Sequence, residues 1–417
     1  MVWTALTLDT WLSRQQATLT GVSGAVQNII DEVAGKGDGA LFDLCERFDK
    51  VKLDHLRVSE DEIDAAYESV DPEIIEALTE AYSRISAFHE LQRQNDLWLS
   101  GSEDGITLGV KTTPLERIGM YVPGGRAAYP STVLMCAVPA QVAGVKEIIC
   151  CTPPPANPLT LVAADIAGVT DIYTVGGAQA IAAMALGTKT INPVEKIVGP
   201  GNAYVTAAKM MLRGKVEIDF PAGPSEIAII ADHTSRPDFI AADILAQSEH
   251  DPQAASVLIT TDPQLPAQVG NWIERLLVEA PRHEIIRQAL AQSGYLVVKS
   301  IADAITTSDK IAPEHLSIQV QDPLPVLQGV RNAGSIFVGQ YAPVACGDYA
   351  SGTNHVLPTA GNAKLYSGLN VSHFTKTATV QIITREGIDS IGDVVERLAT
   401  AEGLHAHAAS ARIRRET

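Results

Sequence analysis

The sequence predicts an α/β protein built from two Rossmann-like lobes, with a helical N-terminal region and a small α+β C-terminal tail. Three observations support this fold class. Short apolar segments alternate with alanine-rich helical segments from Val145 onward, a second alternation of this kind begins near Ser225, and helical periodicity dominates the first 120 residues. Alternating strands and helices are typical of βαβ units, whose crossovers are right-handed and whose sheet is mostly parallel.

The two alternations define the two predicted lobes. In the first, the strand-like segments VKEIICC, DIYTVGG and EKIVGPG precede the helix-like segments LTLVAADIAG, AQAIAAMALG and NAYVTAAKMML. In the second, the strands EIAIIAD, ASVLITT and YLVVKS alternate with a helix from Asp238 to about Glu249 and with VGNWIERLLVEA. Residues 121–226 are therefore predicted to form a Rossmann-like lobe, and the second alternation predicts another sheet with its own helices.

The two ends of the chain have to pack on these lobes. The helical segments AVQNIIDEVAGKGDGALFDLCERF and PEIIEALTEAYSRISAFHELQR are expected to pack on the second lobe, which gives a larger domain of residues 18–120 plus 227–369. Residues 370–417 contain a predicted strand pair, HFTKTATVQIIT, and a final helix, IGDVVERLATAEGL, before a polar end. This segment is too small to bury a core, so we expect it to dock elsewhere, for example on a second subunit. Residues 1–17 are predicted to form an N-terminal arm that packs with this tail.

Composition argues against several classes of function. The chain has 49 acidic and 31 basic residues, a formal charge of −18, which repels nucleic-acid phosphates and anionic lipid surfaces. No segment reaches the roughly 18 apolar residues that span a bilayer, and the N-terminal residues lack the pattern of a signal peptide. The five cysteines have no CxxC spacing, which suits a reducing compartment, and we expect Cys150 and Cys151 to be buried, inert thiols. The predicted location is the cytoplasm.

Three glycine-rich turns follow predicted strands of the first lobe. They are YVPGGRAAYPS, TVGGAQA and VGPGNAY. Glycine lets the backbone approach a ligand closely, and amides at the start of a helix favour anionic oxygens. The segment GPGNAY at 199–204 has tyrosine where the G-x-G-x-x-G fingerprint requires its third glycine. Each turn alone fits an ordinary tight connection, but together they favour a dinucleotide held differently from the usual fingerprint.

A first candidate metal site lies in FIAADILAQSEHD. Ile240, Ile244 and Gln247 are spaced four and three residues apart, so the apolar face of this predicted helix ends in an amide, and His250 lies three residues further on the same face. Gln247 and His250 could together offer one oxygen and one nitrogen ligand to a divalent cation. For an isolated Q-x-x-H the simpler interpretation is a histidine that caps its own helix.

Two further polar clusters strengthen the metal hypothesis. CGDYASGTNHVLPT places Asp348 and His355 in a glycine-containing loop, and AEGLHAHAAS places Glu402, His405 and His407 at the end of the last helix. A glutamine, two histidines and an aspartate would form a nitrogen and oxygen donor set suited to zinc, although glutamine is an unusual zinc ligand. Periodicity alone does not choose between His405 and His407.

The segment IAPEHLSI places a carboxylate and an imidazole side by side. Glu314 and His315 follow a proline and lie between apolar residues. The tetrapeptide PEHL by itself fits a proline-started helical turn with solvated charges. In the company of the glycine-rich turns and the polar clusters, it is instead predicted to be a pair of proton-transfer groups.

Eight motifs in this order resemble the L-histidinol dehydrogenase family. They are YVPGG, VGGAQAI, VGPGNAYV, PAGPSE, QSEH, APEHL, GDYASGTNHVLPT and EGLHAH, and they extend from Tyr121 to His407. The resemblance implies a zinc enzyme of histidine biosynthesis that uses NAD to oxidise L-histidinol to L-histidine through an aldehyde. It also implies a homodimer whose C-terminal segments are exchanged between subunits.

The resemblance assigns roles to individual residues. The implied zinc ligands are Gln247, His250, Asp348 and His407. His407 is chosen over His405 because the family motif is Glu-x-Leu-x-x-His, in which the histidine lies three residues after the leucine, here Leu404. The implied substrate contacts are these four ligands together with Ser225, His315 and Glu402. The implied NAD contacts are Tyr121, Gln179 and Asn202, one from each glycine-rich turn. His405 is expected to be a bystander.

The implied reaction gives Glu314 and His315 different tasks. His315, with an ordinary pKa of about 6.5, suits removal of the alcohol proton. Glu314 suits activation of the water that hydrates the aldehyde, and the hydrate is then oxidised with His315 again as base. Zinc is expected mainly to orient the substrate.

Three rival functions fit the same residues less well. Relatives that oxidise other polar alcohols, such as sulfonated diols, should need a basic residue near the site, whereas the tail motif supplies the acidic Glu402. A zinc hydrolase with Glu314 as its base leaves the glycine-rich turns without a role. A non-catalytic metal-binding protein leaves Glu314 and His315 without one.

Overall fold

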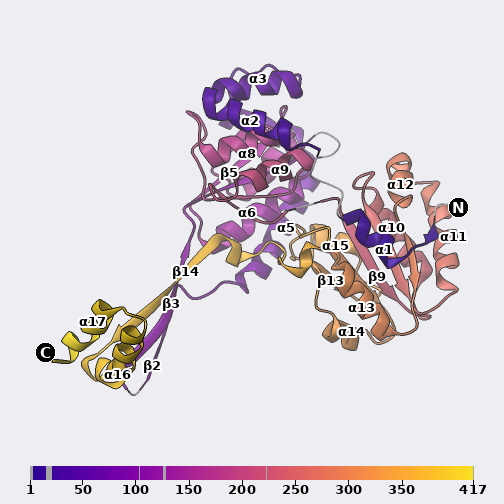
Figure 1. Cartoon of the computed structure of the whole chain (residues 1–417). Helices are drawn as coiled ribbons and strands as arrows, with labels where there is room; N and C mark the ends of the chain where they lie inside the picture. Colours follow the sequence, from indigo (N-terminus) through magenta and orange to yellow (C-terminus); the bar gives the residue numbers. More distant parts are fainter. Residues whose placement is uncertain (1–2, 16–20, 103, 125–127, 222, 417) are drawn as a thin grey trace. The chain divides into compact units, whose positions relative to one another are not determined.

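The computed structural model describes residues 3–15, 21–102, 104–124, 128–221 and 223–416 (Figure 1). The chain forms two compact units. The first contains Met1–Gln92 and Glu116–His373, and the second contains Arg93–Leu115 and Phe374–Thr417. The predicted α/β class is confirmed, because two parallel sheets with helices around them form the first unit.

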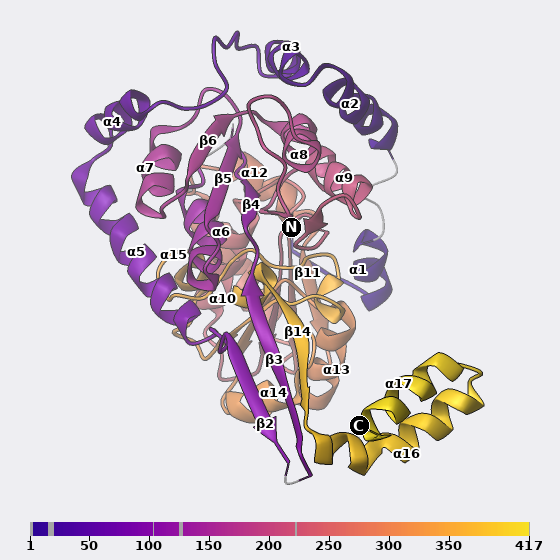
Figure 2. The ribbon, with the colours of Figure 1, turned by 90° about the vertical axis from the view of Figure 1, so that its left-hand side faces the viewer.

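The first sheet has the strand order of a Rossmann fold. Its five parallel strands are β4 (Arg117–Tyr121), β5 (Glu147–Thr152), β6 (Asp171–Thr174), β7 (Lys196–Val198) and β8 (Glu217–Ile218). They are arranged β6-β5-β4-β7-β8, so the chain order across the sheet is 3-2-1-4-5. Figure 2 shows β6, β5 and β4 side by side in this order. In such a sheet, ligands bind beyond the carboxyl ends of the strands where the order reverses, here between β4 and β7.

The helices of the N-terminal region pack on this first sheet, not on the second lobe as we expected. These helices are α2 (Ser23–Lys36), α3 (Asp38–Phe48), α4 (Glu60–Ser69) and α5 (Pro72–Glu90). The connecting helices of the sheet are α6 (Pro130–Ala143), α7 (Pro158–Ile166), α8 (Gly177–Leu186) and α9 (Ala203–Leu212). Helix α2 contacts α8 and α9, α4 contacts α7, and α5 contacts α6. Periodicity identifies the apolar face of a helix but not the surface that buries it.

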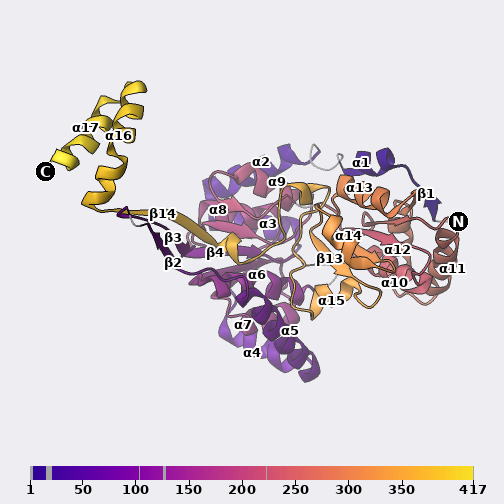
Figure 3. The same cartoon turned by 90° about the horizontal axis from the view of Figure 1, so that it is seen from below.

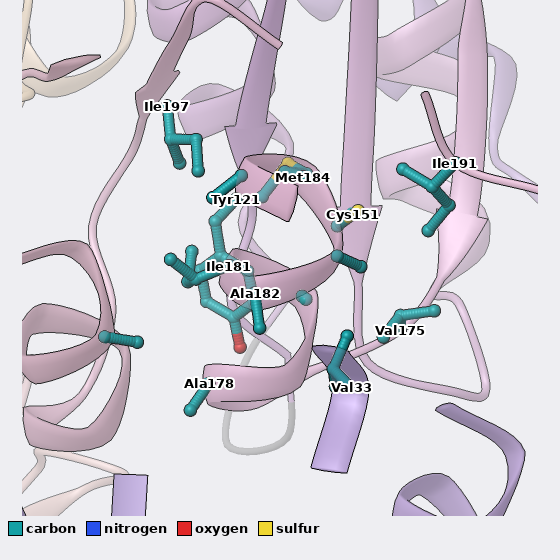
Figure 4. Close-up of a cluster of buried hydrophobic side chains, with 14 of the residues drawn as sticks. Val33, Tyr121, Cys151, Val175, Ala178, Ile181, Ala182, Met184, Ile191 and Ile197 are labelled. Carbon is teal, nitrogen blue, oxygen red and sulfur yellow. The ribbon is translucent and has the colours of Figure 1, made fainter. Parts of the chain in front are cut away.

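One hydrophobic core joins the N-terminal helices to the first sheet. Val26, Ile29 and Val33 of α2 are buried in the same cluster as Tyr121 of β4 and Ile181 of α8. Figure 4 shows Val33, Tyr121 and Ile181 within this cluster. Tyr121, the last residue of β4, is therefore anchored by apolar packing from a region far away in the sequence.

The second sheet repeats the same strand order. Its six parallel strands are β1 (Thr4–Ala5), β9 (Glu226–Ala231), β10 (Ala255–Thr260), β11 (Gly294–Val297), β12 (His315–Gln319) and β13 (Ser335–Val338). The order is β1-β11-β10-β9-β12-β13, so β9 to β13 again follow 3-2-1-4-5 and β1 extends one edge. All residues of β9, β10 and β12 are buried, as expected for a parallel sheet covered on both faces.

Two groups of helices cover the two faces of the second sheet (Figure 3). Ile227 and Ile229 of β9 pack with α10 (Pro237–Ser248), α11 (Leu265–Leu277) and α12 (His283–Leu290). Ala228 and Ile230 face the other way. They pack with α1 (Leu8–Gln15), α13 (Ile301–Ile311) and α14 (Pro323–Gly329).

The described part of the N-terminal arm belongs to the second sheet. Thr4 and Ala5 of β1 pair with Gly294 and Tyr295 of β11, and α1 contacts α13. Residues 16–20 lie outside the described residues. The expected contact between the arm and the tail stays a prediction.

The second unit differs in detail from the predicted tail. The segment HFTKTATVQIIT forms one long strand, β14 (Thr375–Ile383), and not a pair. It pairs antiparallel with β3 (Ile106–Pro114), which also pairs with β2 (Leu97–Gly101) (Figure 2). The sequence of β14 contains no turn residue that would fold it back on itself, so it pairs with a strand more than 250 residues earlier.

The polar end of the chain is a helix. Helix α16 (Arg385–Ala401) is followed by α17 (His405–Glu416), which packs on it. Arg412 and Arg415 of α17 both form ion pairs with Glu396 of α16. These pairs help a polar segment with few apolar residues to keep a fixed place. Among the described residues, no helix is both long and apolar enough to cross a membrane.

Burial of Asp243 predicts a pH-dependent stability. Its carboxylate accepts a hydrogen bond from Gln319 Nε2 over 2.8 Å, and burial raises the pKa of Asp243 to about 6. An aspartate whose pKa is higher in the folded state destabilises that state as the pH rises through the folded pKa. Asp243→Asn keeps the hydrogen-bond acceptor and removes the charge. The unfolding free energy of the variant minus that of the wild type should therefore increase by about 1–2 kcal/mol between pH 5 and pH 8. Urea unfolding at both pH values measures this; an unchanged difference would show that ionisation of Asp243 is not its cause.

Candidate active site

The candidate site lies at the amino ends of the central strands of the second sheet. Glu314 directly precedes β12 and His315 begins it, while Ser225 directly precedes β9. The two strands are neighbours, with His315 opposite Ile227. The glycine-rich turns of the first sheet lie instead at carboxyl ends, so the two sheets present their candidate residues at opposite edges.

A strained turn delivers Glu314 and His315 to this edge. Helix α13 ends before Ala312, which has a left-handed conformation with φ 50° and ψ 64°, and its N–H donates to Ser308 O over 2.7 Å. This conformation costs about 1 kcal/mol or more for a residue other than glycine. Two hydrogen bonds hold the next residues: Gly334 N–H donates to Pro313 O over 3.0 Å, and Ser335 N–H donates to Glu314 O over 2.9 Å.

The Glu314 carboxyl group is held by the start of β9. Glu226 N–H donates to Glu314 Oε2 over 2.8 Å, and Ser225 Oγ donates to Oε1 over 3.4 Å. Glu314 is 5% exposed, and burial raises its pKa well above the usual value. The two hydrogen bonds oppose this rise, whereas the nearby carboxylates of Glu226 and Asp348 add to it. Such a carboxyl group is a stronger base than an exposed glutamate.

His315 is a neutral imidazole in a defined tautomer. Its Nδ1 lies 3.3 Å from Glu226 O, which can only accept, so Nδ1 carries the proton and Nε2 has the free lone pair. Burial is the largest cause that lowers the pKa of His315 to about 3, and the neighbouring His250 and His355 contribute to this decrease. His315 Nε2 lies 4.0 Å from Asp348 Oδ1. The ring therefore presents an unprotonated nitrogen toward the candidate metal ligands.

Three of the predicted metal ligands, Gln247, His250 and Asp348, belong to the first unit, and their chemistry fits a cation. Gln247 is 2% exposed, and neither of its amide atoms has a hydrogen-bond partner among the described residues. His250 remains accessible, yet the surrounding protein lowers its pKa by desolvation. Asp348, in α15 (Val344–Tyr349), has its pKa raised to about 7 by burial. Unpaired buried amide atoms cost free energy, and a bound cation would provide the missing partner for the amide oxygen.

This donor set is incomplete within the first unit. Among the described residues, no three His, Cys, Asp or Glu side chains form a group that could hold a metal ion. Within the first unit, only His250 and Asp348 of the set are of these types, because Gln247 is an amide and His407 belongs to the second unit. Glu402, His405 and His407 are all exposed at the junction of α16 and α17. Their participation in the site stays a prediction.

His355 and Glu226 have larger roles than the sequence indicated. His355 Nδ1 donates to Asp348 O over 3.0 Å, and its Nε2 lies 3.3 Å from Thr132 Oγ1, so His355 supports the end of helix α15, which carries Asp348. Glu226 holds both Glu314 and His315 through its main chain. The sequence did contain a signal for the role of Glu226: a glutamate begins the strongly apolar strand EIAIIA, and a buried charge needs partners.

The predicted NAD contacts lie on the first sheet and its helices. Tyr121 ends β4, and its hydroxyl accepts from Gly177 N–H over 3.1 Å. Gln179 is buried in α8. Asn202 caps α9, with Oδ1 accepting from Tyr204 N–H over 3.0 Å. Each side chain thus already has a structural place beside a glycine-rich turn.

The turn after β7 requires its first glycine. Gly199 has a φ of +105°, and a Cβ atom there would lie 2.3 Å from Tyr121 O. Its N–H donates to Asp219 Oδ2 over 2.8 Å, and Lys209 Nζ donates to Gly199 O over 3.0 Å. Lys209 and Asp219 also form a buried ion pair. The turn therefore brings β4 and β7 close together at the point where the strand order reverses.

Together, the two Rossmann-ordered sheets and the buried carboxyl–imidazole pair define the class of the protein as an α/β enzyme with acid–base chemistry. A family model described as histidinol dehydrogenase matches residues 12–415. The chain belongs to the histidinol dehydrogenase family, a family of oxidoreductases, and the resemblance found in the motifs is confirmed.

Individual relatives agree over nearly the whole chain. The histidinol dehydrogenase of Methanothermobacter thermautotrophicus is 50% identical over 408 residues, which cover 97% of this chain and 96% of that protein. That of Methanosarcina barkeri is 49% identical over 95% of this chain and 92% of its own. The crystal structure of histidinol dehydrogenase from Elizabethkingia anophelis matches with a TM-score of 0.94 and 41% identity, covering 98% of this chain and 96% of that one.

The unpartnered amide of Gln247 leads to a prediction about the metal-free protein. Gln247→Met has a similar shape without buried polar atoms, so it should raise the unfolding free energy of the metal-free protein by about 1–3 kcal/mol. It should also weaken zinc binding, measured by competition with a chromogenic chelator. The exposed Gln268→Met is the matched control and should change stability by less than about 0.5 kcal/mol. A loss of stability in metal-free Gln247→Met would instead indicate that the amide has a structural role.

Proposed function

We propose that this chain oxidises L-histidinol through L-histidinal to L-histidine in two NAD-dependent steps, with one zinc ion per site. Membership of the histidinol dehydrogenase family supports the substrate and the reaction. The observation that carries the mechanism is the buried pair of Glu314 and His315, both held by the main chain of Glu226. A cytoplasmic location agrees with such a biosynthetic role.

In the first oxidation, His315 acts as the general base. Its Nε2 takes the hydroxyl proton of the alcohol while the carbon is oxidised, and its Nδ1–H remains bonded to Glu226 O. The bond at Nδ1 keeps the ring in the orientation and the tautomer that a base requires. Tyr121, Gln179 and Asn202 are the proposed contacts of NAD, which would supply the hydride acceptor for each oxidation.

In the second oxidation, Glu314 activates water. Its carboxylate removes a proton as the water adds to the aldehyde carbon, and the protonated His315 returns its proton to the aldehyde oxygen. The neutral His315 then takes the hydroxyl proton of the hydrate as that carbon is oxidised. Ser225 and Glu226 N–H fix the carboxylate while it does so. The two bases share one support, so the intermediate can react at both without leaving the site.

The proposed zinc ligands are Gln247, His250, Asp348 and His407. Zinc would orient the imidazole and amino nitrogens of the substrate. The proposed substrate contacts also include Ser225 and Glu402, whose carboxylate suits a cationic amine. Within the first unit, the unpartnered amide of Gln247 supports this donor set.

We propose that His407 and Glu402 act in the site of a partner subunit. The second unit exposes large apolar side chains that a partner could cover: Leu97, Trp98, Leu99, Ile382, Ile383, Val394 and Leu398. A segment of this size cannot bury a core of its own. Family resemblance supports an exchanged C-terminal segment in a homodimer.

Turnover with and without metal tests the proposed function. The zinc-loaded protein should form two NADH per L-histidinol, followed by absorbance. Treatment with a strong chelator should abolish turnover and leave the circular dichroism unchanged, because the ligands sit on separately supported elements, and zinc should restore it. Full activity in verified metal-free protein would contradict the zinc assignment. Turnover of a sulfonated diol or an ester in place of L-histidinol would favour a rival function.

The division of labour between the two bases predicts a selective defect. Glu314→Gln keeps the shape of the side chain but cannot accept a proton from water, whereas His315 remains available for the alcohol. Aldehyde oxidation, measured with L-histidinal supplied directly, should slow by about tenfold or more beyond any slowing of alcohol oxidation. Equal slowing of the two half-reactions would show that Glu314 does not have this separate task.

The exchanged tail predicts complementation between inactive variants. His250→Ala and His407→Ala chains, refolded together, should form heterodimers with one site that has all four ligands and one that lacks two. About a quarter of the wild-type activity should return if random pairing makes about half of the dimers heterodimers. Each variant refolded alone is the control. Verified heterodimers without activity would show that His407 acts within its own chain.

A further inference from the structure

We propose that Arg14, in the N-terminal arm, is a positioning residue for both Glu314 and His315 and that it acts through Glu226. The motif analysis gave the arm no part in the site. Arg14 belongs to α1, and its guanidinium group reaches the first residue of β9: Arg14 Nη1 donates to Glu226 Oε2 over 3.3 Å. The inference rests on the proposed function, because its assay is the oxidation of L-histidinol.

Glu226 is the common support of the two bases. Its N–H donates to Glu314 Oε2 over 2.8 Å, and its carbonyl accepts from His315 Nδ1 over 3.3 Å. Both bonds come from the same residue, so a shift of its main chain moves the two bases together. Displacement of a reacting group by about 1 Å can cost up to about a hundredfold in rate.

The side chain of Glu226 in turn needs Arg14. The side chain is 1% exposed, and its Oε1 accepts from Ala360 N–H over 3.0 Å. A carboxylate buried to this extent is strongly destabilising without a cation, because it has lost its hydration. Arg14 supplies the cation, and its own side chain is 19% exposed.

Two other contacts orient the guanidinium group. Arg14 Nη2 donates to Gln253 O over 3.1 Å, and the group lies 5.0 Å from the ring centre of Trp11, which is buried in the core of the second sheet. These contacts fix the orientation of the guanidinium group, so that its Nη1 atom points toward Glu226. Arg14 therefore connects the arm to the two bases without touching a reacting atom.

The test compares kcat and KM of Arg14→Met with those of the wild type at equal zinc content. The kcat for L-histidinol should fall between about tenfold and a hundredfold, while KM changes by less than about twofold, because Arg14 contacts no substrate. Arg117→Met is the matched control, since it removes another partly exposed ion pair, with Glu147 on the first sheet. The control should keep the wild-type kcat, even if it loses stability.

A second substitution tests the route through Glu226. Adding Glu226→Gln to Arg14→Met removes the buried charge with which Arg14 pairs and keeps the acceptor for Ala360, so part of the lost kcat should return. If Arg14→Met does not fold, Arg14→Gln is judged by the same criteria. If the wild type turns over L-histidinol, a kcat of the Arg14 variant within twofold of the wild-type value, or equal to that of Arg117→Met, would overturn the inference. A double variant that recovers none of the lost kcat would also overturn it. Failure of the wild type itself to oxidise L-histidinol would overturn the proposed function instead.

Discussion

Parallel pairing of β9 with β12 is the constraint on which the candidate site depends. It places His315 opposite Ile227, and so places Glu226, the residue before Ile227, beside both Glu314 and His315. Main-chain groups in the middle of a buried sheet move little, because each is fixed by its ladder of hydrogen bonds and by packing on both faces. The main chain of Glu226 is fixed in this way, so the side chains of Glu314 and His315 that it binds are also held in place, although they lie at the edge of the sheet.

Burial controls the electrostatics of the site. It raises the pKa of Glu314 well above its usual value and that of Asp348 to about 7, and it lowers that of His315 to about 3. These shifts all favour the neutral forms, because ions are poorly solvated there. Nearby positive charge would shift both carboxyl groups back toward their ionised forms. The proposed metal and the cationic substrate are ligands of this kind.

The two sheets have the same strand order but carry different candidate sites. In the first, the glycine of the turn after β7 lets the backbone approach Tyr121 at the point where the order reverses. In the second, the polar groups gather at the amino ends, reached by the strained turn at Ala312 and by the end of α10. One architecture thus supports a candidate nucleotide site and a candidate acid–base site, because the loops at either edge of a parallel sheet can vary independently of its core.

The sequence by itself determined the fold class and three strands of each lobe, and it singled out the polar residues of the candidate site, because alternation of apolar segments and the local spacing of motifs are properties of short stretches of chain. It placed Glu314 and His315 at a turn, since a proline precedes them and apolar residues lie on either side. It did not determine the sheet on which α2 to α5 pack, the single long strand β14, or the helix α17, because these depend on partners distant in the sequence. Only the tertiary structure decided that Glu226 supports both bases and that Arg14 reaches Glu226 from 212 residues away. Such contacts follow from the register of parallel strands and from the packing of the arm. Both depend on two distant segments at once, so neither segment alone predicts the contact.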